Sequence, residues 1–172
     1  MNIYTQKFTL SSHILEFDSA KGILRCMSLG SGKVSWVKQL DDILNIDSVS
    51  ENHDIFFLSC RIDETSGKFI ALSKTDGMTS WFIPGHEFLH VLHKDSLFLI
   101  FIDNAETYYL IKVDVKDGSP AWQRVVEFDL YEYSIDDDSV TLFYKSGRTE
   151  YVDRDTGETV NSSSPSYRSC NT

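Results

Sequence analysis

The sequence has few cysteines and no long apolar run. Its three cysteines, Cys26, Cys60 and Cys170, lack metal-ligand spacing and are an odd number. We therefore expect a reduced, cytoplasmic protein in which they are small apolar residues or spare thiols. The longest apolar run, residues 97–102 (LFLIFI), has the length of a strand and is far shorter than the roughly 20 residues of a membrane-spanning helix. The N-terminus lacks the pattern of a secretory signal, so we expect none.

Positive charge is also scarce. The chain has 16 Lys and Arg against 26 Asp and Glu, which gives a formal net charge of −10. This balance disfavours nucleic acid and anionic membranes as partners, because their phosphates require clusters of Lys and Arg. It would instead steer a basic protein towards the surface. With 172 residues, 41% of them hydrophobic and 13% aromatic, the chain is long enough for one globular domain with a preference for strands.

One stretch has the sequence pattern of a zinc site. Residues 85–93 (GHEFLHVLH) contain the pattern H-E-x-x-H, which on a helix places two metal ligands beside a general base. A Pro-Gly pair before it and aromatic residues within it favour a strand instead. In a regular strand His86 and His90 share one face, and Glu87 points to the other. We therefore predict no metal site, and we expect His90 to be packed or hydrogen-bonded and His93 to lie at a hairpin.

An internal repeat organises most of the chain. Four segments, residues 28–36, 73–81, 114–122 and 153–161, each have glycine at the fifth position. These glycines are Gly32, Gly77, Gly118 and Gly157, spaced by 45, 41 and 39 residues. Three of the segments have tryptophan four residues after the glycine: Trp36, Trp81 and Trp122. The fourth segment has Asn161 at that position.

Each repeat has the pattern of four strands. Polar residues and glycine supply the positive φ of a tight turn, with an apolar or alternating strand before it and the tryptophan strand after it. A further strand, a polar hairpin and an apolar strand lie between one tryptophan and the next turn. Four strands in roughly 40 residues are typical of a propeller blade. We predict an all-β fold, a small β-propeller of about four four-stranded antiparallel blades in residues 1–162, followed by a polar tail at 163–172.

The turn-and-tryptophan unit resembles the tryptophan-docking repeat of the PQQ-like (quinoprotein-type) β-propeller family. Residues 108–122 (YYLIKVDVKDGSPAW) are the best copy, and the resemblance covers residues 12–161. It implies that each tryptophan stacks between neighbouring blades. Members of the family usually have more blades, so either four blades close into a ring or two chains complete a larger one. We favour the closed monomer, because each blade is complete in the sequence, with residues 2–10 completing the first blade or pairing with the last.

The resemblance does not imply a cofactor here. We expect no quinone, because the calcium-ligand and disulfide features of the cofactor-binding enzymes cannot be placed in this sequence. A G-x-S-x-G elbow and a P-loop are also absent from the sequence. We therefore expect a protein that is not an enzyme, although propellers as a fold have many functions.

Carboxylates and tyrosines gather in residues 127–138 (EFDLYEYSIDDD). They form a plausible surface for a basic protein. The alternative is a solvated hairpin, with the tyrosines packed on a neighbouring blade. Equivalent positions in a propeller lie on one side of the ring, so the acidic residues around 41–51 extend the same rim. The predicted partner-binding residues are Asp129, Tyr131, Glu132, Tyr133, Asp136, Asp137, Asp138, Asp41, Asp42 and Glu51.

These features indicate a non-catalytic protein-binding module. Its acidic profile is similar to that of bacterial immunity proteins, antitoxins that cover the active site of a basic toxin, often a nuclease, with carboxylates in place of phosphate. A scaffold or adaptor propeller for complex assembly is the alternative, with a metal-dependent hydrolase using residues 86–93 as the least favoured one.

Overall fold

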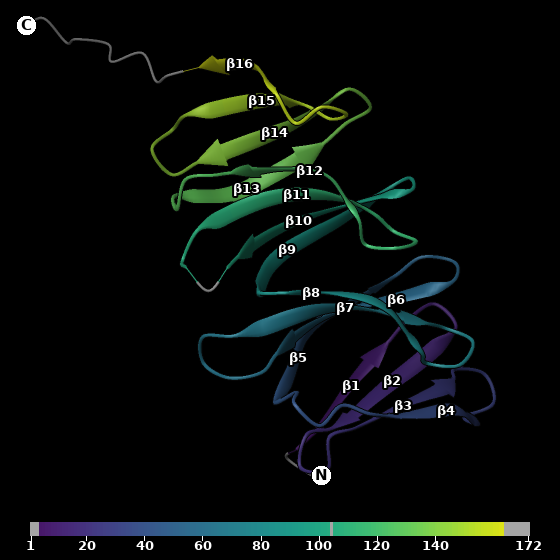
Figure 1. Cartoon of the computed structure of the whole chain (residues 1–172). Helices are drawn as coiled ribbons and strands as arrows, with labels where there is room; N and C mark the ends of the chain where they lie inside the picture. Colours follow the sequence, from purple (N-terminus) through teal and green to yellow (C-terminus); the bar gives the residue numbers. More distant parts are fainter. Residues whose placement is uncertain (1–3, 104, 164–172) are drawn as a thin grey trace, which may run out of the picture.

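The computed structural model describes residues 4–103 and 105–163, with the side chains of 161–163 excepted. They form sixteen β-strands in four antiparallel sheets, each made of four consecutive strands (Figure 1). The prediction of an all-β propeller with four-stranded blades is confirmed. None of the described residues belongs to a helix that could cross a membrane.

The strands follow one another along the chain, and the four sheets are called blades 1 to 4. Blade 1 contains β1 (Thr5–Thr9), β2 (His13–Asp18), β3 (Ile23–Ser28) and β4 (Val34–Gln39). Blade 2 contains β5 (Asn45–Glu51), β6 (Ile55–Arg61), β7 (Gly67–Ser73) and β8 (Thr79–Pro84). Blade 3 contains β9 (His86–His93), β10 (Ser96–Ile102), β11 (Tyr108–Asp114) and β12 (Pro120–Val125). Blade 4 contains β13 (Leu130–Ile135), β14 (Ser139–Tyr144), β15 (Thr149–Asp153) and β16 (Thr159–Ser163).

The burial of each strand follows its place in the sheet. The middle strands of the inner blades are buried on both faces, and β6 and β10 are accordingly almost continuous apolar runs. The outer strands β4, β8 and β12 alternate instead, with the tryptophan turned inward. In every blade the ladder between the third and fourth strands shifts register beside the position of the tryptophan, which indicates a bulge repeated four times.

Three apolar clusters hold the blades together, one at each boundary between consecutive blades. Each tryptophan crosses its boundary: the indole N–H of Trp81 donates to the carbonyl of Val115 at 3.0 Å, and its ring lies against Gly118. The other two behave in the same way, since Trp36 donates to the carbonyl of Lys74 and Trp122 to that of Arg154, both at 2.9 Å. A tryptophan and a glycine from adjacent repeats therefore fix the spacing of the blades.

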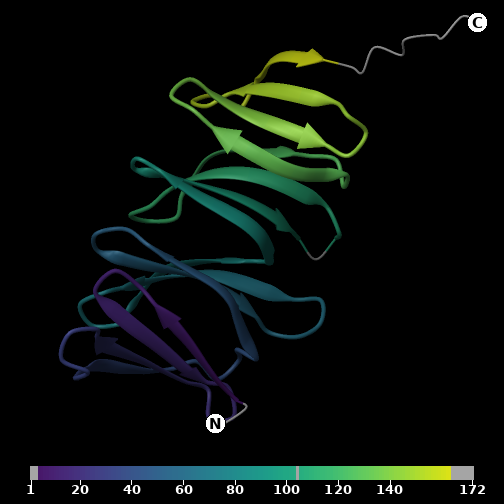
Figure 2. The same ribbon diagram turned by 180° about the vertical axis from the view of Figure 1, so that it is seen from behind.

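The four blades form an open series and not a closed ring. Blade 1 and blade 4 lie at opposite ends of the molecule in both views (Figures 1 and 2). The expectation of a ring closed by four blades is therefore wrong, whereas β1 does complete the first blade by pairing with β2. The physical reason lies in the end faces. On the free face of blade 1, Glu16 and Arg25 form an ion pair at 3.4 Å, at positions where blade 2 has the buried Leu58 and Ile70.

Candidate functional site

The blades have two ends with different structure. At the hairpin end lie the hairpins between the first and second strands and the glycine turns between the third and fourth. Backbone hydrogen bonds join these two kinds of turn. For example, the N–H of Lys74 donates to the carbonyl of Asp54 at 2.9 Å. At the loop end lie the loops between the second and third strands and the connections between blades. Backbone hydrogen bonds join these as well; for example, the N–H of Val126 donates to the carbonyl of Tyr108 at 2.9 Å.

The predicted acidic residues divide between these ends. Glu51 and residues 136–138 belong to the hairpin end, since they end or follow the first strand of their blade. Asp41, Asp42 and Asp129 precede a first strand and belong to the loop end. The structure therefore does not bring the ten predicted residues together in a single rim.

At the hairpin end the carboxylates build the fold. Asp136 accepts the N–H groups of Asp138 at 2.9 Å and Ser139 at 2.7 Å, and these hydrogen bonds lower the pKa of its carboxyl. Asp137 accepts from Lys94 of blade 3 at 2.5 Å, and this hydrogen bond and the lysine charge lower the pKa of Asp137. Both carboxylates thus already have partners within the chain.

Glu51 has the same structural role between blades 1 and 2. It pairs with Lys74 and accepts the N–H of Ser11 at 2.7 Å. Burial raises its pKa, but the hydrogen bonds from Lys74 and Ser11 outweigh burial, so the pKa of Glu51 is lower than usual.

The predicted tyrosines behave differently from each other. Tyr133 is buried, donates to the carbonyl of Phe98 at 3.0 Å and belongs to the cluster between blades 3 and 4. Burial raises the pKa of Tyr133, and the negative charge of the nearby Glu87 raises it further. Tyr131 is 55% exposed, and Glu132 beside it is exposed as well.

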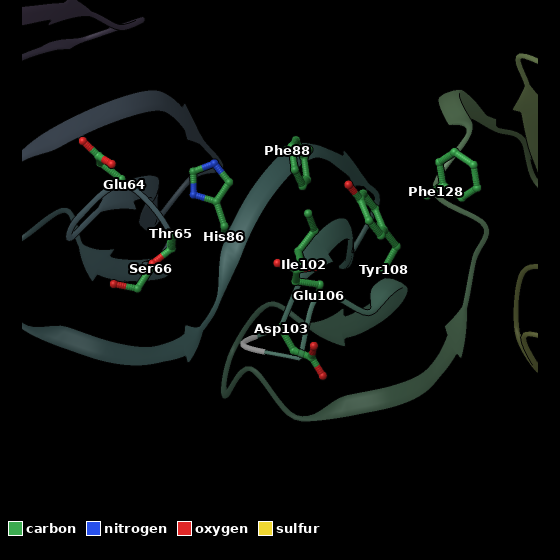
Figure 3. Close-up of a pocket in the computed structure, with 10 residues that line it drawn as sticks. All are labelled: Glu64, Thr65, Ser66, His86, Phe88, Ile102, Asp103, Glu106, Tyr108 and Phe128. Carbon is green, nitrogen blue, oxygen red and sulfur yellow. The ribbon is translucent and has the colours of Figure 1, made fainter.

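A concave surface lies at the loop end, as a groove of about 870 Å³ shown in Figure 3. The loop between β6 and β7, the start of β9, the loop between β10 and β11 and the connection before β13 contribute to it, so three blades meet there. Its lining residues are Glu64, Thr65, Ser66, His86, Phe88, Ile102, Asp103, Glu106, Tyr108 and Phe128. We call this surface the loop-end groove.

Aromatic rings dominate this groove. Phe88 stacks on Tyr108 with ring centroids 5.9 Å apart and an interplanar angle of 15°, and it meets His86 edge-on at 5.3 Å. Figure 3 shows the Phe88 ring between His86 and Tyr108, with Phe128 beyond Tyr108. Phe88 is 52% exposed and Phe128 is 80% exposed, which is unusual for side chains of this size.

A bulge explains why Phe88 is exposed. The register of β9 on β10 shifts between Ile100 and Phe101, which makes Phe88 the extra residue of the strand. Shifts at equivalent places make Asp47 and Tyr131 the extra residues of β5 and β13. Bulges turn a side chain away from the regular alternation, so Phe88 and Tyr131 face solvent at equivalent positions.

The groove also carries negative charge. Asp103 accepts the N–H groups of Ala105 at 2.9 Å and Thr107 at 3.0 Å and so shapes the loop. Glu64 and Glu106 are exposed, and Glu106 has a φ of 60°, an uncommon conformation for a residue other than glycine. Among the described residues that line the groove there is neither lysine nor arginine. Aromatic rings beside exposed carboxylates can bind basic and apolar side chains together.

The bulge also changes the geometry of the H-E-x-x-H segment. The segment is a strand, as predicted, but the prediction that Glu87 points away from His90 is wrong, because the extra residue brings both side chains to one face. His90 Nδ1 lies 3.3 Å from Glu87 Oε1, and His90 Nε2 lies 2.6 Å from Ser50 Oγ. These part-buried contacts link Ser50 of blade 2 to His90 and Glu87 of blade 3. Among the residues that the structure describes, no three His, Cys, Asp or Glu side chains gather closely enough to hold a metal ion.

Sequence reasoning missed the loop-end groove. Its residues come from three blades, and the lining of a groove depends on how those blades pack. Two signals were present: an aromatic residue within the misleading histidine motif, and Phe128 in a connection between blades. Neither signal shows on its own that the two rings line one surface.

Comparisons with known proteins identify the fold. No protein-family model and no curated protein matches the chain. Among solved structures, BamB from Moraxella catarrhalis matches with a TM-score of 0.61 and 21% identity over 95% of this chain. A europium-containing methanol dehydrogenase matches with a TM-score of 0.63 and 12% identity over 94% of this chain. The computationally designed Ika8 protein matches with a TM-score of 0.63 and 8% identity over 91% of this chain.

The chain spans only part of the proteins that it resembles, with 49% of BamB, 41% of the methanol dehydrogenase and 48% of Ika8 covered. The four-stranded blades, the tryptophans docked on glycine turns and these similarities agree with one another. The chain has the fold of the PQQ-type β-propellers.

Proposed function

We propose that the chain is a non-catalytic protein-binding propeller whose loop-end groove holds a segment of a partner protein with basic and apolar side chains. The observation that carries this proposal is the exposure of Phe88 and Phe128 beside the exposed Glu64 and Glu106 on a concave surface. Exposed aromatic side chains of this kind are enriched where proteins bind one another.

The chemistry of the groove supports such a partner. Covering a phenylalanine ring contributes about 1.5–3 kcal/mol. A lysine or arginine of the partner would approach the carboxylates of Glu64 and Glu106 and could also stack on an aromatic face, which contributes roughly 0.5–2 kcal/mol. The net charge of −10 would accelerate the encounter with a basic protein at low salt.

A narrower proposal concerns the biological role. An immunity protein that neutralises a basic toxin, such as a nuclease, would need an acidic surface of this kind, and it would act in the cytoplasm. A scaffold or adaptor that holds two proteins together is the alternative. If the narrower proposal is right, expressing the chain protects cells against a nuclease toxin encoded by a neighbouring gene. A scaffold would give no protection and would copurify with two partners at once.

The binding proposal can be tested with defined peptides. We would measure fluorescence anisotropy for decapeptides that alternate Arg or Lys with Leu, Phe or Pro, with a matched set in which Glu replaces every basic residue. We expect saturable binding of basic members only, weakened by salt. Replacing Phe88 and Phe128 by alanine should weaken it at least about tenfold, which corresponds to about 1.4 kcal/mol.

Val125→Ala provides the control, since Val125 is 62% exposed and does not line the groove. It should leave the affinity unchanged. Equal binding of basic and acidic peptides, or full binding by the double phenylalanine variant, would rule out the groove as the binding surface.

A further inference from the structure

The glycine turn of blade 1 lacks the cover that the other three turns have. A Cβ atom built at Gly77, Gly118 or Gly157 would meet the tryptophan of the preceding blade at 2.5–2.7 Å, whereas one at Gly32 meets none of the residues that the structure describes within 4 Å. Beside this turn Leu29 is 44% exposed. The equivalent residue of blade 3, Val115, is 5% exposed, because it packs in the cluster that contains Trp81. Leu29 therefore has the character of a residue covered by a neighbouring blade.

The free face of blade 4 carries a hollow beside Tyr151. Tyr151 pairs with Asn161 in the ladder, and the equivalent pairs in blades 1 to 3 are Cys26 with Trp36, Ala71 with Trp81 and Lys112 with Trp122. A cavity of about 420 Å³ opens beside Tyr151 and is lined by Asp138, Ser139, Tyr151, Asp153 and Val160. Val160 is 68% exposed at its edge. One end of the molecule thus offers an apolar projection and the other a partly apolar hollow.

The charges of the two end faces are complementary. Lys7, Glu16 and Arg25 are neighbours across the sheet of blade 1, and Asp18 on the same face is buried and paired with Lys21 at 3.4 Å. These five residues carry one more positive than negative charge. On blade 4 the exposed Glu132 and the half-buried Asp153 belong to the free face. A face with polar residues is also what an interface between separately folded chains requires, because such interfaces are about as polar as the rest of the surface.

We propose that two copies of this chain join end to end and close one ring of eight blades. The Gly32 turn of each copy, with Leu29, packs into the hollow beside Tyr151 of the other. A two-fold axis relates the two contacts, so both end faces of each copy are covered at once. The four blades match about half of BamB and of Ika8, so a ring of this kind has room for a second set of four blades. This proposal does not depend on the binding function of the loop-end groove.

The test is the solution mass of the whole chain, measured by light scattering and by sedimentation over a wide range of concentration. We expect the mass to rise to twice the 19.7 kDa of one chain. Leu29→Glu and Tyr151→Glu should each shift the chain to monomer. A mixture of the two variants should recover a dimer, because one undamaged Leu29 turn still meets one undamaged Tyr151 hollow. That recovery also shows that both variants fold.

Leu44→Glu is the matched control, because Leu44 is 60% exposed and lies between blades 1 and 2, away from the end faces. It should dimerise like the original chain. A monomer at every concentration would overturn the proposal. A dimer that survives both single substitutions, or one that Leu44→Glu also disrupts, would overturn it equally, because the contact would then lie elsewhere.

Discussion

The two ends of the blades use the same residue types for different purposes. At the hairpin end, Asp136, Asp137 and Glu51 accept hydrogen bonds from turn amides or pair with lysines, and the glycine turns receive the tryptophans. At the loop end, Glu64, Glu106 and two phenylalanines are exposed around a groove. A carboxylate that already has partners in its own chain is less available to another molecule than one beside uncovered apolar rings.

This difference explains why the density of acidic residues in the sequence was a poor guide to the site. The run at residues 136–138 is conspicuous because hairpins and blade contacts need aspartates there. Burial and hydrogen-bond partners distinguish the two ends, and neither can be counted in the sequence. The predictions below test that distinction.

The largest effect on stability should come from the tryptophan-covered turns. Gly118→Ala adds a Cβ only 2.5 Å from Trp81 Cδ2 at a residue with a φ of 71°. We expect a loss of about 2–5 kcal/mol, since a left-handed alanine costs about 1–2 kcal/mol and overpacking about 1–3 kcal/mol. Urea denaturation of both the variant and the original chain gives this value.

Gly32→Ala, measured at a concentration at which the chain is monomeric, is the matched control, because its φ of 66° is similar and an added Cβ meets none of the described residues within 4 Å. Only the backbone cost of about 1–2 kcal/mol should remain. If both substitutions cost the same, the tryptophan contacts do not hold the hairpin end together.

A smaller effect should appear in acid. The pKa of Glu51 is lower in the folded chain than the usual 4.3 or so of an unfolded glutamate. Its contribution to stability is therefore complete above the unfolded pKa and is lost as the pH falls through the lower folded pKa. Glu51→Gln should flatten this part of the dependence of the unfolding free energy on pH below about pH 5. An unchanged acid slope would show that the pairing with Lys74 contributes nothing.

The smallest effect should come from Asp137→Asn. The carboxylate is 75% exposed, and exposed ion pairs contribute little to stability. We expect an unfolding midpoint close to that of the original chain and no change in the affinity for basic peptides. Weaker peptide binding would show that the peptide binds at the hairpin end, as the sequence analysis predicted.

Much of the fold could be predicted from the sequence because it repeats. The contact between neighbouring blades is visible in the sequence as a tryptophan followed, one repeat later, by a glycine: Gly77, Gly118 and Gly157. The apolar runs of β6 and β10 indicate that these strands are buried on both faces. The open ends were not predictable in this way, because they depend on Glu16 and Arg25 replacing apolar residues on one face. The bulge at Phe88 was equally hidden, since one extra residue reverses which side chains share a face and no residue type marks it.

The most direct test of the division between the two ends is a map of chemical-shift changes. An isotopically labelled sample of the whole chain would be titrated with a basic member of the peptide set. We predict that the largest changes fall on amides around Glu64, Phe88, Glu106, Tyr108 and Phe128, with residues 136–138 and the glycine turns unaffected. Changes concentrated at residues 136–138 would contradict the account.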